Sequence, residues 1–85
     1  MTNRAVWKDE AREHRNAIDT ALARSEQNLR GIEQRTLNER QANMLAQARD
    51  FDRQARAMRD SDVRAARSLA ERSEQLSREL LSTLR

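Results

Sequence analysis

The sequence contains no proline, no cysteine and a single glycine, Gly31, in 85 residues. Proline and glycine mark turns and hairpins, so their scarcity argues against β architectures and loop-built active sites and favours long helices. The absence of cysteine excludes disulfide bonds, cysteine-ligated zinc and thiol catalysis. Aromatic side chains are limited to Trp7 and Phe51. We therefore expect an all-α protein.

Long apolar segments are missing as well. No apolar run in the sequence approaches the roughly 18 residues of a membrane-spanning helix. The first residues, Met1 to Trp7, lack the apolar stretch of a signal peptide. We expect no membrane span, and a cytoplasmic protein if Met1 is the native start.

A strong excess of one charge is also missing. The chain has 17 lysines and arginines against 14 aspartates and glutamates, and its formal net charge is +3. The charges are evenly spread along the chain. The pI near 10.9 therefore reflects the high pKa of arginine acting on a small charge excess, and not a strong positive field. A local exception is an arginine row near one face of a predicted helix: Arg49, Arg53, Arg56 and Arg59. Aspartates interleave with this row, so a solvated face is the main interpretation and phosphate contact the alternative.

What the sequence does have is apolar residues at helical spacing. Steps of three, four and seven residues define three seams of the kind that pack helices together. The first seam contains Ala11, Ile18, Leu22, Ser25, Leu29 and Ile32. The second contains Leu37, Met44, Ala48, Phe51, Ala55 and Met58, and the third contains Val63, Ala66, Leu69, Ser73, Leu76, Leu80 and Leu84. Phe51 is the largest residue of the second seam, so we expect it in the core.

The seams are interrupted at two places. The first lies near Gly31, which can end a helix in the left-handed conformation, while Thr36 and Glu39 form a T-x-x-E capping box for the next helix. At the second, Ser61 or Asp62 can cap a following helix. The sequence therefore predicts three helices of similar length, near 4–30, 36–59 and 62–84.

Three helices with short connections indicate one domain over residues 1–85. The expected architecture is an antiparallel three-helix bundle or a helical hairpin plus one helix. The alternative is a long coiled coil closed by dimerisation. Opposite charges four residues apart, such as Glu26 with Arg30 and Asp52 with Arg56, indicate solvated outer faces.

One segment carries a family resemblance. Asp62, Ala66, Ala70 and Leu76 stand at the spacing of the aspartate, alanines and leucine in the second helix of a tetratricopeptide repeat, which residues 62–76 resemble. Ser61 stands where that family has glycine, and no second copy lies 34 residues away. The resemblance covers about residues 37–76 and implies one repeat-like hairpin that binds protein.

The sequence offers little for catalysis. His14 is its only histidine, with Glu10 one helical turn before it. A di-iron site in a helical bundle needs Glu-x-x-His spacing on two helices, and that spacing is absent. Glycine-rich phosphate loops and hydrolase motifs are missing too. The sequence predicts no catalytic residue, no metal site, no cofactor and no enzymatic activity.

The small apolar content points to association. Leucine, isoleucine, valine and phenylalanine supply 14 of the 85 residues, so the core of a single chain is modest. We expect a homodimer. The expected contact residues are an N-terminal tryptophan and a C-terminal leucine group: Trp7, Leu76, Leu80, Leu81 and Leu84.

The predicted function is a non-catalytic helical protein–protein interaction or assembly module. The alternative is an accessory nucleic-acid-binding protein that uses the arginine row.

Overall fold

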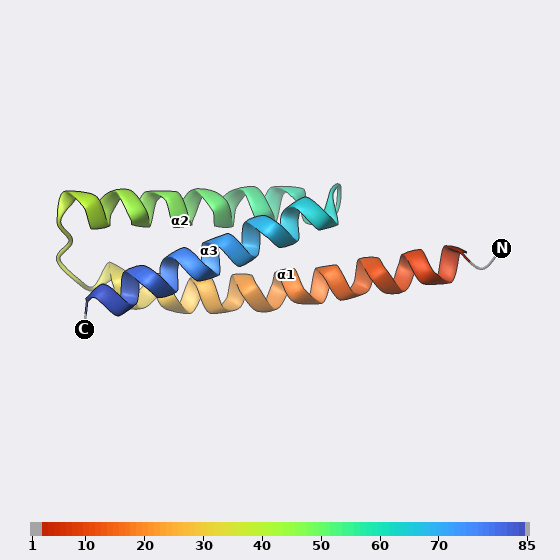
Figure 1. The fold of residues 1–85 in the computed structure, drawn as a ribbon, viewed down its shortest axis with the longest axis horizontal. Coiled ribbons are helices and arrows are strands. Elements are labelled where there is room, and N and C mark those ends of the chain that lie inside the picture. Colours follow the sequence, from red (N-terminus) through yellow and green to blue (C-terminus); the bar gives the residue numbers. More distant parts are fainter. Residues whose placement is uncertain (1–2, 85) are drawn as a thin grey trace.

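Three helices make up the part of the chain that the computed structural model describes, namely the backbone of residues 3–84 and the side chains of residues 8–84. They are α1 (Asn3–Glu33), α2 (Glu39–Met58) and α3 (Val63–Thr83), joined by two short turns (Figure 1). The chain reverses direction at each turn, so α2 runs antiparallel to the other two helices. The all-α, three-helix bundle is confirmed, and the alternative of one long coiled coil is wrong.

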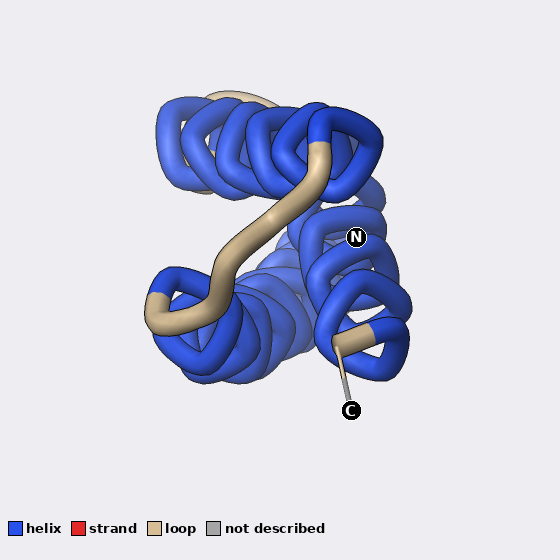
Figure 2. The backbone as a smooth tube through the Cα atoms, turned by 90° about the vertical axis from the view of Figure 1, so that its left-hand side faces the viewer, coloured by secondary structure: helices blue, strands red, loops and turns tan. Residues whose placement is uncertain are grey.

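The third helix holds the bundle together. α3 packs along both α1 and α2, whereas α1 and α2 approach each other closely at few points. Figure 2 shows this from one end of the bundle, with the α1–α2 connection crossing between the two helices. α1 has 31 residues against 20 and 21 in α2 and α3, so its N-terminal turns extend beyond them (Figure 1). The expected similar length of the three helices is therefore wrong for α1.

The first turn lies later than the sequence predicts. Gly31 stays inside α1, has no positive φ, and faces the side chain of Leu81. α2 begins after Asn38, whose side chain accepts from Gln41 N at 2.8 Å, while the Gln41 side chain accepts from Asn38 N at 3.0 Å. The capping box predicted at Thr36 is therefore wrong, because Asn-x-x-Gln forms the same reciprocal bonds two residues further on.

The second turn lies where the sequence predicts it. Asp62 is the N-cap of α3, and its carboxylate accepts from Ala65 N at 3.2 Å. The backbone N–H groups of Ser61 and Asp62 both donate to the carbonyl of Met58, at 3.2 and 2.9 Å. These bonds satisfy backbone groups that the helix ends would otherwise leave free.

The core consists of two apolar clusters with serines between them. The cluster near the α2–α3 turn is formed by Ile18, Ala21, Leu22, Ala55, Ala66 and Ala70. The cluster near the α1–α2 turn is formed by Leu29, Ile32, Ala48 and Leu80. Between them Ser25 and Ser73 are fully buried, with their hydroxyl oxygens 2.6 Å apart. The Ser73 hydroxyl also donates to the carbonyl of Ala48 at 2.8 Å, so one polar layer joins all three helices.

Phe51 does not lie in this core. It is half-buried, and the fully buried positions of α2 are Ala48 and Ala55. α3 is similarly lined by small residues, including Ala70 and Ser77, with Leu69 and Leu76 displaced to its flank. Small side chains let the helix backbones approach closely, which leaves no room between them for a phenyl ring. The expectation of a core Phe51 is therefore wrong, although the first seam is buried from Ile18 to Ile32 as predicted.

Candidate interaction surface

The bundle has three outer edges, one between each pair of helices. At the α1–α2 edge the two backbones approach closely at few points, and long side chains form ion pairs across the gap. On α1 the carboxylates of Asp19, Glu26 and Glu33 are spaced seven residues apart. They face arginines of α2 and its C-cap in antiparallel order. Arg59 contacts Asp19 at 2.7 Å, Arg56 contacts Glu26 at 3.9 Å and Arg49 contacts Glu33 at 2.8 Å.

The arginine row is thus occupied by the protein's own carboxylates. Three of its members form the pairs just described, and Arg53 contacts Asp50 at 3.4 Å on the same helix. The two hydrogen bonds from Arg59 lower the pKa of Asp19 below its usual range, so that carboxylate stays charged near neutrality. The structure brings the predicted arginines together, but beside anionic partners that compete with phosphate.

The α1–α3 edge is also polar. Arg64 of α3 forms a close ion pair with Glu10, and Arg24 of α1 approaches Glu74 at 3.8 Å. Between them Arg67 donates from Nη1 to Nδ1 of His14 at 3.2 Å. A hydrogen bond from Arg64 is the main reason why the pKa of Glu10 lies below its usual range. Charged and polar contacts therefore cover this edge over most of its length.

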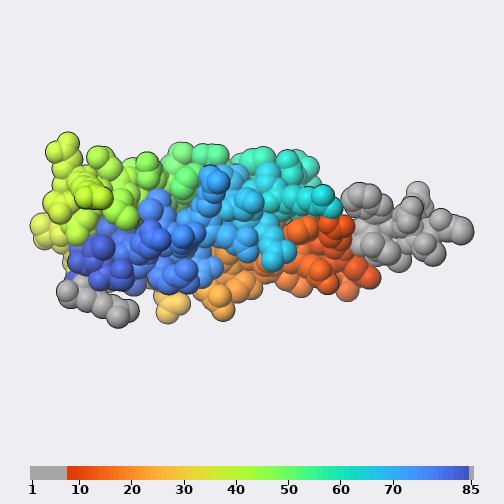
Figure 3. Space-filling model, in the orientation of Figure 1, coloured from red at the N-terminus to blue at the C-terminus, as the bar shows by residue number. Residues whose placement is uncertain are grey.

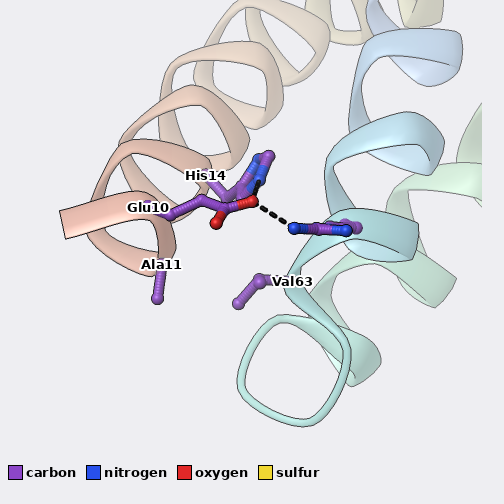
Figure 4. A pocket seen from close by; sticks show the side chains of 5 residues that line it. Glu10, Ala11, His14 and Val63 are labelled. Atoms are coloured by element: carbon purple, nitrogen blue, oxygen red, sulfur yellow. Dashed lines mark hydrogen bonds and ion pairs between the residues drawn. The ribbon is translucent and has the colours of Figure 1, made fainter. Parts of the chain in front are cut away.

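A small pocket lies at this edge beside His14. Figure 4 shows Glu10 extending from α1 toward α3, with Ala11 and Val63 lining the hollow from opposite sides. Its volume is about 60 Å³, which is the space of about two water molecules. The described residues contain no cluster of three or more side chains able to hold a metal ion. His14 is half-buried, and its ring nitrogen accepts a hydrogen bond from Arg67. These contacts fit a structural role for His14, in which it joins α1 to α3.

The α2–α3 edge is different, because no ion pair between the described residues crosses it. Near the α1–α2 turn, Gln41 donates a hydrogen bond from Nε2 to the hydroxyl of Thr83 across this edge, at 3.3 Å. Further along the edge, five apolar and half-buried residues follow one another. We call them the apolar strip: Met44, Phe51, Met58, Leu69 and Leu76. Figure 3 shows the side of the molecule on which α2 and α3 lie next to each other along this edge.

The strip consists of two rows that match in antiparallel register. Met58 and Leu69 both pack against the core cluster near the α2–α3 turn, and Met44 and Leu76 both pack against the other cluster. Met44 also borders one hollow together with Thr83, which continues the α3 row one heptad beyond Leu76. In this register Phe51 lies at the middle of the strip.

Only some of the contact residues expected from the sequence are accessible to a binding partner in the structure. Leu80 is fully buried among the chain's own helices, so it cannot contact a partner in this conformation, and that expectation is wrong. Leu76, Leu81 and Leu84 are half-buried and pack against the cluster around Leu80. The backbone of Trp7 lies in α1, but its side chain is outside the described residues.

Sequence reasoning missed the apolar strip as a surface. A signal was present, because Met44, Phe51 and Met58 recur every seven residues, as Leu69 and Leu76 do. The helical spacing alone predicts both rows at the centre of the bundle. The centre is taken by the neighbouring heptad positions, which carry alanine and serine.

Comparisons with protein-family models, with curated proteins and with solved structures found no match to this chain. The tetratricopeptide-repeat resemblance of residues 37–76 therefore stays a prediction. Among the described residues, no helix combines the length and apolar character needed to cross a membrane.

Proposed function

We propose that this protein is a non-catalytic helical module that binds another protein surface through the α2–α3 edge. The observation that carries the proposal is the contrast among the three edges. Ion pairs span the α1–α2 and α1–α3 edges, whereas the α2–α3 edge presents the apolar strip. Apolar side chains that stay partly exposed along one line mark a surface that gains free energy when a partner covers it.

The character of the strip supports a helical partner. Met44, Phe51 and Met58 repeat at seven residues, which is the spacing by which a packed helix recognises its neighbour. Methionine and phenylalanine are also enriched at protein interfaces. An added helix lying along this edge would bury both rows of the strip together.

The proposal can be tested by site-specific photocrosslinking in the native host. A photoreactive phenylalanine analogue replaces Phe51 in one variant, and it replaces Ala23, which is exposed on α1, in the matched control. We expect protein adducts from position 51 in excess of those from position 23. Equal labelling at the two positions, or no protein adduct at position 51, would contradict binding at this edge.

Nucleic-acid binding through Arg49, Arg53, Arg56 and Arg59 has weaker support. Each of these arginines already contacts a carboxylate, so a phosphate would have to displace an existing partner. Binding of this kind would weaken steeply with added salt, because phosphate neutralisation releases counterions. Salt-dependent retention of the protein on DNA or RNA that Arg49→Gln and Arg56→Gln reduce would favour this alternative.

A further inference from the structure

Exposed polar side chains flank the apolar strip on both helices. Residues three and four positions away are nearest neighbours on a helix surface. The outward neighbours of Phe51 are therefore Gln47 and Gln54, and those of Leu76 are Arg72 and Glu79. All four are exposed. The α2 side of the strip is thus polar but uncharged at its middle, while the α3 side carries one cation and one anion.

Arg72 and Glu79, the two charges on the α3 side, are unpaired as far as the described residues show. Among the described residues, neither Arg72 nor Glu79 has an oppositely charged group within ion-pair distance. The side chain of Glu79 accepts one long hydrogen bond from Gln75, at 3.4 Å. The two residues are one heptad apart, on the same side of α3 and on either side of Leu76. This arrangement is self-complementary, because a two-fold rotation through the Leu76 region exchanges the positions of Arg72 and Glu79.

We propose that the α2–α3 edge binds a second copy of this chain, with the two α3 helices antiparallel and Leu76 near the two-fold axis. Arg72 then meets Glu79 of the second copy, and Glu79 meets Arg72 of the second copy. The apolar strips of both copies are covered, with Phe51 at the centre of each. The inference rests on the proposed function and adds the identity of the partner. A partner of uniform charge would pair with one of Arg72 and Glu79 and repel the other, whereas a second copy pairs with both.

The first measurement is sedimentation equilibrium of the full chain over a wide range of loading concentrations. We expect a mass that rises from 9.9 kDa toward twice that value as the concentration increases. A concentration-independent mass of 9.9 kDa would overturn the inference. The proposed function would survive that result if position 51 still formed adducts with a different protein, and both would fail if it formed none.

The second measurement locates the interface by charge exchange. Arg72→Glu and Glu79→Arg each create two like-charge contacts across the axis, and each should raise the dissociation constant by about tenfold. Mixing the two variants in equal amounts should restore association, because a mixed dimer pairs two glutamates with two arginines. Arg12→Glu, at an exposed position of α1, is the matched control and should leave association unchanged.

Neither exchange breaks an ion pair between residues 8–84, so circular dichroism should show unchanged helicity for all three variants. The inference would be overturned if Arg72→Glu and Arg12→Glu changed the dissociation constant of the dimer equally. It would also be overturned if an equal mixture of Arg72→Glu and Glu79→Arg associated no more tightly than each variant alone. Phe51→Ser provides an independent check, since it should weaken the dimer while the monomer stays helical.

Discussion

The hydroxyl oxygens of Ser25 and Ser73 lie 2.6 Å apart at the centre of the bundle, where both side chains are fully buried. The single proton of the Ser73 hydroxyl is directed to the carbonyl of Ala48. The proton shared between the two serines must therefore come from Ser25, so the bonds run in one direction from α1 through α3 to α2.

Replacing either serine should reveal this order. Ser73→Ala leaves the Ser25 hydroxyl buried without its acceptor and should lower the free energy of unfolding by about 1–3 kcal/mol. Ser25→Ala leaves the bond from Ser73 to Ala48 intact and should cost less. The double variant should cost less than the sum of the two, because it removes both ends of one bond. Urea titrations at one fixed protein concentration test this, and strictly additive losses would contradict the proposed coupling.

Leu80 and Phe51 should differ sharply in their contribution to stability. Leu80→Ala opens a cavity in the core and should cost about 2–5 kcal/mol. Phe51→Ala removes a half-buried ring and should cost about 1 kcal/mol at low protein concentration, where association contributes least. Denaturant unfolding of the two variants provides the comparison. A loss at Phe51 as large as that at Leu80 would place the ring in the core after all.

Gly31 should be replaceable by alanine with a gain in stability. Its backbone is helical, and a Cβ atom there would lie 3.4 Å from Cδ1 of Leu81, which is an ordinary van der Waals contact. Alanine has the higher helix propensity, so Gly31→Ala should raise the free energy of unfolding by up to about 1 kcal/mol. Thermal unfolding followed by circular dichroism measures the change. A lower melting temperature would indicate a left-handed backbone at this position.

Acid should destabilise the bundle in part through Asp19. Its pKa lies below the ordinary value of 3.8 because Arg59 donates two hydrogen bonds to the carboxylate. A carboxyl group with a lowered folded-state pKa contributes stability above its unfolded-state pKa, and that contribution is lost as the pH falls through the folded-state value. The contribution is small because the pair is largely exposed.

The measurement is the free energy of unfolding between neutral pH and pH values below 3.8, for the wild type and for Asp19→Asn. The variant should be less stable than the wild type at neutral pH, and the difference should shrink as the solution is acidified. A difference that stays constant with pH would show that the Arg59 contact does not stabilise the fold. Glu10 should add to the acid sensitivity in the same way, since Arg64 lowers its pKa from an ordinary value of 4.5.

The helical class, the number of helices and the second turn could be predicted because they depend on local chemistry. Asp62 caps α3 by bonds within four residues, and the scarcity of breakers is visible in the composition. The first turn could not be placed correctly, because two overlapping capping patterns compete there. Thr36 with Glu39 and Asn38 with Gln41 have the same spacing, and only the packed structure selects the second.

The seven-residue spacing of the candidate surface is visible in the sequence, but its position outside the centre of the bundle is not. Phe51 is three residues after Ala48 and four before Ala55, so it shares a helix face with both buried positions. Which side of that face meets α3 is decided by the arrangement of the three helices. Ion pairs between different helices depend on the helix arrangement in the same way. Glu26 pairs locally with Arg30 as predicted, but its approach to Arg56 across the α1–α2 edge requires the antiparallel register.

The central position of α3 has a consequence for biosynthesis. α1 and α2 contact each other little and are joined mainly through the helix that follows them in the chain. While the ribosome is still making α3, the core cluster around Ile18 and Ala55 lacks Ala66 and Ala70, which α3 supplies. We therefore expect the bundle to form only after translation of α3, in one late step, rather than helix by helix during synthesis.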